Sequence, residues 1–166
     1  MIYLANIVTE KNRAVTAPKR TILDVTKGLV YKVEFNFPSG SAGLVGVAVF
    51  DGLYQVWPSS VGQFFTSDAE TIGFDDLYLK ESAPYKFDVY TYNADDTYDH
   101  ELNVRVGLVS NEMYVARFLP HKGYEYFMEL LEKVRAEQAA AAEAQRQVIA
   151  ETPFEWLLRQ GEELCV

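Results

Sequence analysis

Cysteine and histidine are nearly absent from this chain of 166 residues. The single cysteine, Cys165, has no second cysteine with which to form a disulfide, and two histidines, His100 and His121, cannot complete a tetrahedral zinc site with it. We therefore expect a fold held together by its own core, without a disulfide, a bound metal or another cofactor.

Positive charge is also scarce, because 15 Lys and Arg stand against 24 Asp and Glu, a formal net charge of -9. Nucleic acids and anionic membranes are bound by clustered Lys and Arg, so neither is expected as a partner. The apolar runs fall short of the roughly 18 residues that a membrane-spanning helix needs. The first residues also lack a basic stretch followed by an apolar one, so we expect synthesis in the cytoplasm without a signal peptide.

Signatures of catalysis are missing as well. No serine stands in a GxSxG sequence. Acid pairs for glycoside hydrolysis can be drawn from many acidic residues, Asp88 and Glu101 among them, so no single pair stands out. The sequence therefore predicts a protein that is not an enzyme.

Aromatic residues are plentiful, with 11 Tyr, 10 Phe and 2 Trp, and they favour strands. Residues 30–37 alternate strictly between apolar and polar side chains, and residues 44–50 are nearly all apolar. Asp51-Gly52 predicts a tight turn into a strand at 53–57. Further strands are expected at 21–25, 71–74, 77–80, 85–93 and 101–109. With no helix-sized segment between them, they predict an antiparallel β-sandwich.

The sandwich is expected to occupy residues 20–118, between an N-terminal arm at 1–19 and a helical extension at 119–166. Apolar residues in the arm would add an edge strand to the arm's own sheet or to a neighbour's. In the extension, residues 124–150 lack proline and glycine, which predicts a long helix of about 40 Å. Thr152-Pro153 then predicts the start of a short second helix at 154–160.

The long helix carries apolar residues at heptad spacing, with Gln138 and Gln145 at two positions of the same seam. Such a seam is typical of an oligomeric coiled coil, in which polar residues set the register, but it would equally suit packing on the chain's own sheet. The residues expected at an interface are Tyr124, Phe127, Leu131, Val134, Val148, Phe154, Trp156 and Leu157.

Two clusters are candidates for ligand binding. Asp95, Asp96 and Asp99 lie in one acidic loop that would suit calcium, although an Asx turn between two strands explains the same residues. The second cluster is aromatic, and exposed rings in it would stack on sugars, whereas buried rings would only pack. Its members are Tyr54, Trp57, Phe64 and Phe65.

Residues 20–109 contain the runs LVGVAVFDG, YQVWP and ETIGFDD, followed by PYKFDVYTYN and HELNVRVGLV around the loop NADDTYD. In texture and strand order this stretch resembles the small single jelly-roll β-domains encoded among virus and prophage structural genes. The resemblance implies a jelly-roll-like sandwich that builds or decorates capsids and spikes through symmetric contacts and has no active site.

The function predicted from these observations is a non-enzymatic structural protein, incorporated into a virion or similar particle as a homo-oligomer that assembles through its sandwich and its helical tail. A carbohydrate-binding sandwich that uses the four aromatic residues is the alternative.

Overall fold

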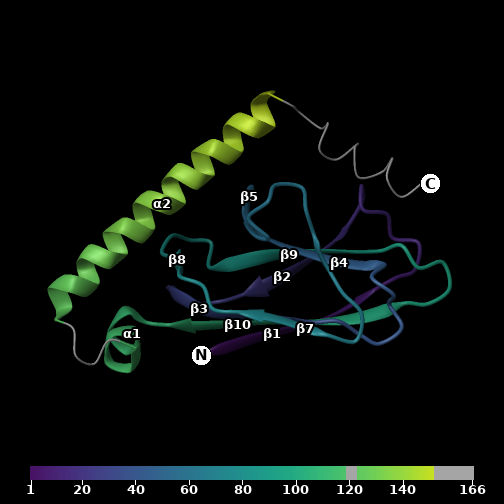
Figure 1. The fold of residues 1–166 in the computed structure, drawn as a ribbon, viewed down its shortest axis with the longest axis horizontal. Helices are drawn as coiled ribbons and strands as arrows, with labels where there is room; N and C mark the ends of the chain where they lie inside the picture. The colour runs from purple at the N-terminus through teal and green to yellow at the C-terminus, as the bar shows by residue number, and fades with distance from the viewer. Residues whose placement is uncertain (119–122, 152–166) are drawn as a thin grey trace.

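The computed structural model describes residues 1–118 and 123–151 (Figure 1). The strands are β1 (Ile2–Thr9), β2 (Lys19–Asp24), β3 (Gly28–Asn36), β4 (Val45–Asp51), β5 (Tyr54–Trp57), β6 (Phe65–Thr66), β7 (Thr71–Phe74), β8 (Tyr78–Lys80), β9 (Lys86–Asn93) and β10 (His100–Val109). The helices are α1 (Asn111–Phe118) and α2 (Tyr124–Glu151).

Alternating burial along the strands separates core side chains from outward-facing ones. In β3, Val33 and Phe35 are fully buried while Lys32 is exposed. Because successive side chains of a strand point to opposite faces, the buried rows of the two sheets meet and form the core. Phe35 packs there against Phe65, with ring centroids 5.2 Å apart.

The strands form two antiparallel sheets. One, the β1 sheet, has the order β1-β10-β3-β7, with β8 also paired to β3; the other, the β2 sheet, has the order β2-β9-β4-β5, with β6 also paired to β4. The pairs are nested, since β4 pairs with β5 and β6, β3 with β7 and β8, β2 with β9, and β1 with β10. A chain that doubles back once and is then wound into two sheets in this way has jelly-roll topology.

The expected mainly β architecture, an antiparallel sandwich followed by a long helix, is confirmed. Within residues 1–19, β1 adds an edge strand to its own sheet by pairing with β10 along its whole length. Helix α1 occupies residues 111–118, which the sequence analysis assigns to the sandwich. The short helix expected at 154–160 lies outside the described residues.

The chain reverses between β4 and β5 at Gly52 and Leu53, one position later than the sequence predicts. Gly52 has a φ of 63°, in the left-handed region that glycine adopts at little cost. Asp51 is consequently the last residue of β4, and its side chain is available to bond with β8.

The outer face of the β2 sheet is covered by the segment that follows β5. Tyr92 lies across Gly46, where a Cβ atom would stand 2.1 Å from the tyrosine ring, so only glycine fits there. Phe64 meets Tyr92 edge to face, with centroids 5.1 Å apart. The Gln55 side chain holds this segment by donating to three carbonyls and accepting from the N–H of Gly62.

Helix α2 packs along the side of the sandwich where β8 and β5 end the two sheets (Figure 1). Phe127, Leu131 and Val134 are buried against Leu29 and Leu79 of the β1 sheet. The first part of the predicted helical seam therefore packs on the chain's own sandwich.

Two glutamines of α2 bond to the backbone of the strands at this edge. The Oε1 atom of Gln145 accepts from the N–H of Gln55, and its Nε2 donates to the Gln55 carbonyl, at 3.1 and 2.8 Å. Gln138 accepts from the N–H of Leu79 in β8 at 3.4 Å. Each glutamine amide thus makes hydrogen bonds to the strand backbone that a further strand of the sheet would otherwise make. We call this side the helix-covered edge.

Replacing Gln145 with Ala should destabilise the fold, because it leaves the buried N–H and C=O of Gln55 without partners. We expect the free energy of unfolding to fall by about 1–3 kcal/mol, measured by urea titration followed by circular dichroism. Gln147→Ala, at an exposed position of the same helix, is the matched control and should change stability by less than about 0.5 kcal/mol. Equal losses in the two variants would contradict this account.

Candidate functional site

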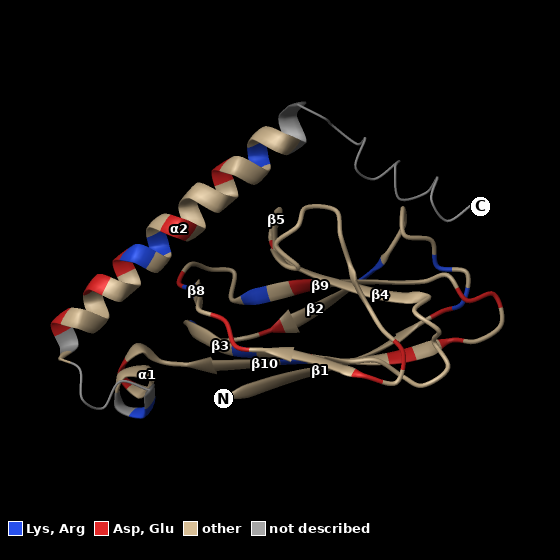
Figure 2. Cartoon of the chain, in the orientation of Figure 1, with Lys and Arg blue, Asp and Glu red and all other residues tan. Residues whose placement is uncertain are grey.

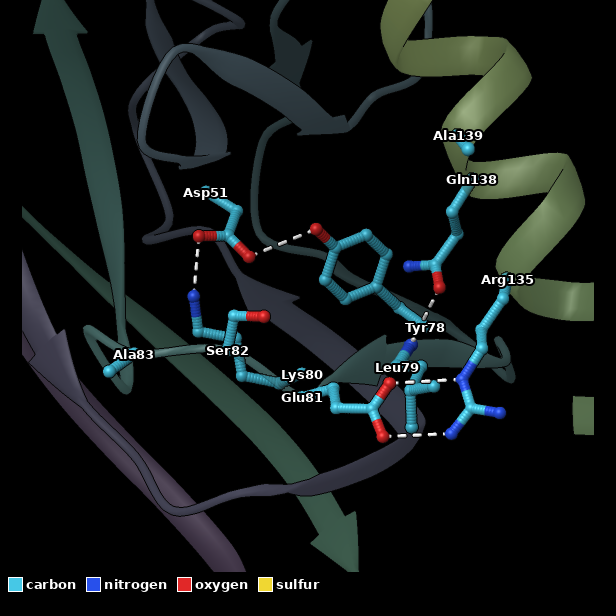
Figure 3. A pocket seen from close by; sticks show the side chains of 10 residues that line it. All are labelled: Asp51, Tyr78, Leu79, Lys80, Glu81, Ser82, Ala83, Arg135, Gln138 and Ala139. Carbon is cyan, nitrogen blue, oxygen red and sulfur yellow. Dashed lines mark hydrogen bonds and ion pairs between the residues drawn. The ribbon is translucent and has the colours of Figure 1, made fainter.

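A pocket of about 330 Å³ lies between α2, β8 and the turn that follows β8 (Figure 3). At one end, the Asp51 carboxylate accepts hydrogen bonds from the Lys80 ammonium and from the Tyr78 hydroxyl. Lys80 is 2% exposed, and its Nζ lies 5.6 Å from the centroid of the Phe87 ring. Burial and the neighbouring Asp51 charge raise the pKa of Tyr78 well above its usual value, so its phenol stays protonated and donates.

At the other end of the pocket, the Arg135 guanidinium on α2 meets Glu81 (Figure 3). Nε and Nη2 donate to the two carboxylate oxygens at 2.9 and 2.8 Å, a bidentate pair that fixes the geometry of both side chains. The hydrogen bond from Arg135 lowers the pKa of Glu81, which keeps the carboxylate ionised. This pair fastens α2 to the turn after β8.

The charges that line the pocket are therefore paired with one another. Catalysis by a nucleophile or a general base requires a group that is poised toward a reacting atom. Here Asp51 is held by two donors, and Glu81 is held by Arg135. These bonds connect β4, β8, the turn after β8 and α2, and we call them the polar joint.

The four aromatic residues considered for ligand stacking do not form an exposed platform. Trp57 is 3% exposed, and its Nε1 donates to Asp76 at 2.6 Å. Tyr54 is half-buried and stacks on Tyr78, Phe65 packs in the core, and Phe64 lies on Tyr92. These four rings pack against other residues of the fold.

The acidic loop forms a turn. The Oδ1 atom of Asp95 accepts from the N–H groups of Thr97 and Tyr98, and its Oδ2 lies 2.9 Å from Nε2 of His100. Asp99 accepts from the backbone N–H of Lys11, and Asp96 accepts from the Thr97 hydroxyl. Over residues 1–118 and 123–151, no group of three or more His, Cys, Asp or Glu side chains could hold a metal ion.

The residues predicted at a helical interface divide into three groups. Phe127, Leu131 and Val134 are buried against the sandwich. Val148 is 46% exposed near the end of α2, and Tyr124 is the first residue of that helix. The third group, Phe154, Trp156 and Leu157, lies outside the described residues.

Opposite the helix-covered edge, β1 and β2 are the end strands of their sheets. Outward-facing apolar residues stand beside this edge: Ile2 is 68% exposed, Leu4 54% and Val8 47% on the β1 sheet, and Ile22 is 50% exposed on the β2 sheet. We call β1 and β2 with these four side chains the open edge. Within the described part of the chain, no strand or helix pairs with β1 or β2 on this side.

Charge is distributed unevenly along the sequence. Residues 1–32, which include β1 and β2, hold six Lys and Arg against two acidic residues. Residues 33–166 hold nine Lys and Arg against 22 acidic residues, which recur along α2 (Figure 2). In the open edge itself, β1 carries no charged side chain, and Lys19 and Arg20 of β2 are paired with Glu10 and Asp88.

Comparison with known proteins supplies no family for this chain: no family model matches it, and no sequence match is found among the curated proteins. Neither helix in the described residues combines the length and the apolar character needed to cross a membrane. The open edge is the candidate functional site.

Sequence reasoning noted the apolar residues of the N-terminal arm but missed the polar joint at the helix-covered edge. Asp51 was visible only as part of a turn, and Lys80 only as the end of a strand. Gln138 and Gln145 carried a detectable signal, since both interrupt an apolar seam. Two glutamines in an apolar seam predict that the seam contacts polar atoms, but they do not identify those atoms.

The Asp95 turn predicts a loss of stability in acid. Hydrogen bonds from the Thr97 N–H, His100 and the Tyr98 N–H lower the pKa of Asp95 below its ordinary value of 3.8. The contribution of the carboxylate is therefore complete above pH 3.8 and is lost as the pH falls below it toward the lower pKa of the folded state.

We expect Asp95→Asn to lower the urea midpoint of unfolding near neutral pH. The difference in midpoint between this variant and the native protein should narrow below pH 3.8. Asp96→Asn, in the same loop, is the matched control and should show a smaller gap at neutral pH. A gap for Asp95→Asn that stays constant into acid would show that charge does not carry the effect.

Proposed function

We propose that this protein is a non-enzymatic structural subunit that assembles with copies of itself into a particle. Viral and prophage capsid, decoration and spike proteins are the class we have in mind. The jelly-roll strand order supports the proposal, because viral capsid domains use this architecture. The paired charges of the pocket also fit a role in which the polar groups hold the fold together.

The observation that carries the proposal is the contrast between the two sides of the sandwich. Over residues 1–118 and 123–151, the protein's own helix covers one pair of edge strands, and no strand or helix pairs with the other pair, which has apolar side chains beside it. Unprotected edge strands readily pair with other chains, and natural proteins that stay monomeric protect them. An open edge of this kind is expected of a subunit whose edge meets a neighbour.

The free energies of burial and association favour repeated contacts over a single one. Burying a Leu or Ile side chain completely contributes about 1.5–3 kcal/mol, so four half-exposed ones would contribute about 3–6 kcal/mol. Association of two proteins costs about 4–15 kcal/mol in lost freedom and ordering. One open edge therefore supports a weak pairwise contact, which gains strength when every subunit of a particle makes it.

The proposal predicts a defined oligomer in solution. Light scattering on a sizing column should give a mass that is a multiple of 18.8 kDa and that grows with protein concentration, and negative-stain electron microscopy should show particles of uniform size. A mass of one chain at every concentration tested would contradict the proposal.

A further inference from the structure

We propose that an exposed row of residues on α2 pairs with the same row of a second copy, with the two helices antiparallel. This inference rests on the proposed assembly function and names one of the contacts that such an assembly uses. A contact between identical surfaces about a two-fold axis closes on two copies. It therefore joins subunits in pairs, and the open edge is left for the contact between pairs.

The row consists of six residues of α2 that stand alternately four and three positions apart. At this heptad spacing, residues stay on one side of a helix and can meet a partner helix along their whole length. We call the row the outer seam, to distinguish it from the seam that packs on the sandwich. Its residues are Tyr126, Leu130, Lys133, Glu137, Ala140 and Ala144.

The outer seam faces away from the chain's own sandwich, along the outside of which α2 runs (Figure 1). With 3.6 residues per turn, it falls about 100° around the helix from the residues that α2 buries against the sheets. Tyr126 is 48% exposed, Leu130 is half-buried, and the other four residues are exposed. Arg135 lines the pocket on the opposite flank, so the polar joint holds α2 in place without occupying the outer seam.

The order of side-chain sizes along the outer seam suits an antiparallel partner. An antiparallel pair centred on Arg135 sets Tyr126 against Ala144 of the second copy, and Leu130 against its Ala140. Each large side chain then meets a small one, which lets the helices approach closely and fills the space between them. A parallel pair would set tyrosine against tyrosine and alanine against alanine, and would alternate crowding with gaps.

The same alignment pairs opposite charges at the centre of the outer seam. Lys133 of each copy faces Glu137 of the other, so this contact is made twice. A shift of one heptad in either direction would set Lys133 against Leu130 or against Ala144, and both charge pairs would be lost. In a parallel pair, lysine would face lysine. Side-chain size and charge thus select the same orientation and the same alignment.

The ion pairs already present on α2 leave these charges able to bind. Lys133 pairs with Glu129 at 3.1 Å, and the two side chains are 66% and 63% exposed. Such an exposed pair is weak, and a lysine ammonium has three donors, so Lys133 can bind a second carboxylate. Glu137 takes part in no ion pair over residues 1–118 and 123–151.

Most of the other acidic residues of α2 lie outside the contact. Glu125, Glu132 and Glu143 fall about 100–120° around the helix from the outer seam, and all three are exposed. The excess of negative charge on the helix is therefore carried by its solvent side, where it does not bring like charges together between the two copies.

The contact is short and is made largely by small side chains. From Tyr126 to Ala144 the outer seam spans about 27 Å, and only Tyr126 and Leu130 bring large apolar surface to it. A contact of this size is weak by itself. It gains strength when every subunit of an assembly makes it, as the proposed function requires.

The first test exchanges charge between copies of the full-length protein. Lys133→Glu places two acids at each charge contact, and Glu137→Lys places two lysines there. We expect each variant alone to associate about tenfold more weakly than the native protein, measured by light scattering over a series of concentrations. In an equimolar mixture of the two variants every contact regains opposite charges, so association should return to the native strength.

Glu143→Lys is the control for this test, because it reverses a charge at an exposed position of α2 outside the outer seam. It should associate as the native protein does. Circular dichroism of each variant separates lost association from lost folding. A mixture of Lys133→Glu and Glu137→Lys that associates no better than either variant alone would overturn the inference.

The second test measures the orientation of the paired helices. In full-length Cys165→Ser protein, a nitroxide spin label is attached at Glu143→Cys, and the distance between labels is measured by pulsed electron paramagnetic resonance. Antiparallel helices centred on Arg135 hold the two labels about 24 Å apart along the helix axes. Parallel helices would hold them near the interaxial spacing of about 8–10 Å. We expect the longer distance, and we expect Lys133→Glu to abolish it; the shorter distance would overturn the inference.

The outcomes separate the helix pair from the assembly function. Native protein that assembles, with Lys133→Glu and Glu137→Lys assembling equally well, would overturn the helix pair and leave the assembly function standing. Native protein that stays a single chain at every concentration would overturn both.

Discussion

Every sheet ends in a row of backbone N–H and C=O groups on each side, and these groups must find partners in protein or in water. In this fold the demand is met on one side by α2, whose glutamines bond to Gln55 and Leu79 while its apolar residues close the core beneath. The pocket, its ion pairs and the direction of the helix all follow from this covering. The position of the open edge follows from it too, since one helix of this length covers one side of the sandwich.

Most of the strands could be predicted because their signals are local. Residues 30–37 alternate, and Asp51-Gly52 marks a reversal, so neither requires knowledge of a distant partner. The nested pairing of β1 with β10 and of β2 with β9 could not be derived in this way, because it joins segments far apart in the chain. The helix at 111–118 was missed because it has only eight residues, too few for its apolar residues to establish a helical period.

The candidate sites show why a residue pattern alone leaves functions open. A heptad seam has the same spacing whether it meets another helix or the edge of a sheet, so Gln138 and Gln145 fitted a coiled coil as well as the contact that exists. Trp57 and Phe65 could have been exposed rings or core residues, and only packing against Phe87 and Phe35 separates the two. The acidic loop was ambiguous in the same sense, since Asp95 serves a turn with the oxygen atoms that a cation would use.

The open edge is more selective than an unprotected strand would be. Lys19 occupies the carbonyl of Val8 and pairs with Glu10, which shortens the row of free backbone groups. A charged side chain at an edge strand limits pairing with another chain, so Lys19 restricts how far a second strand could add along β1.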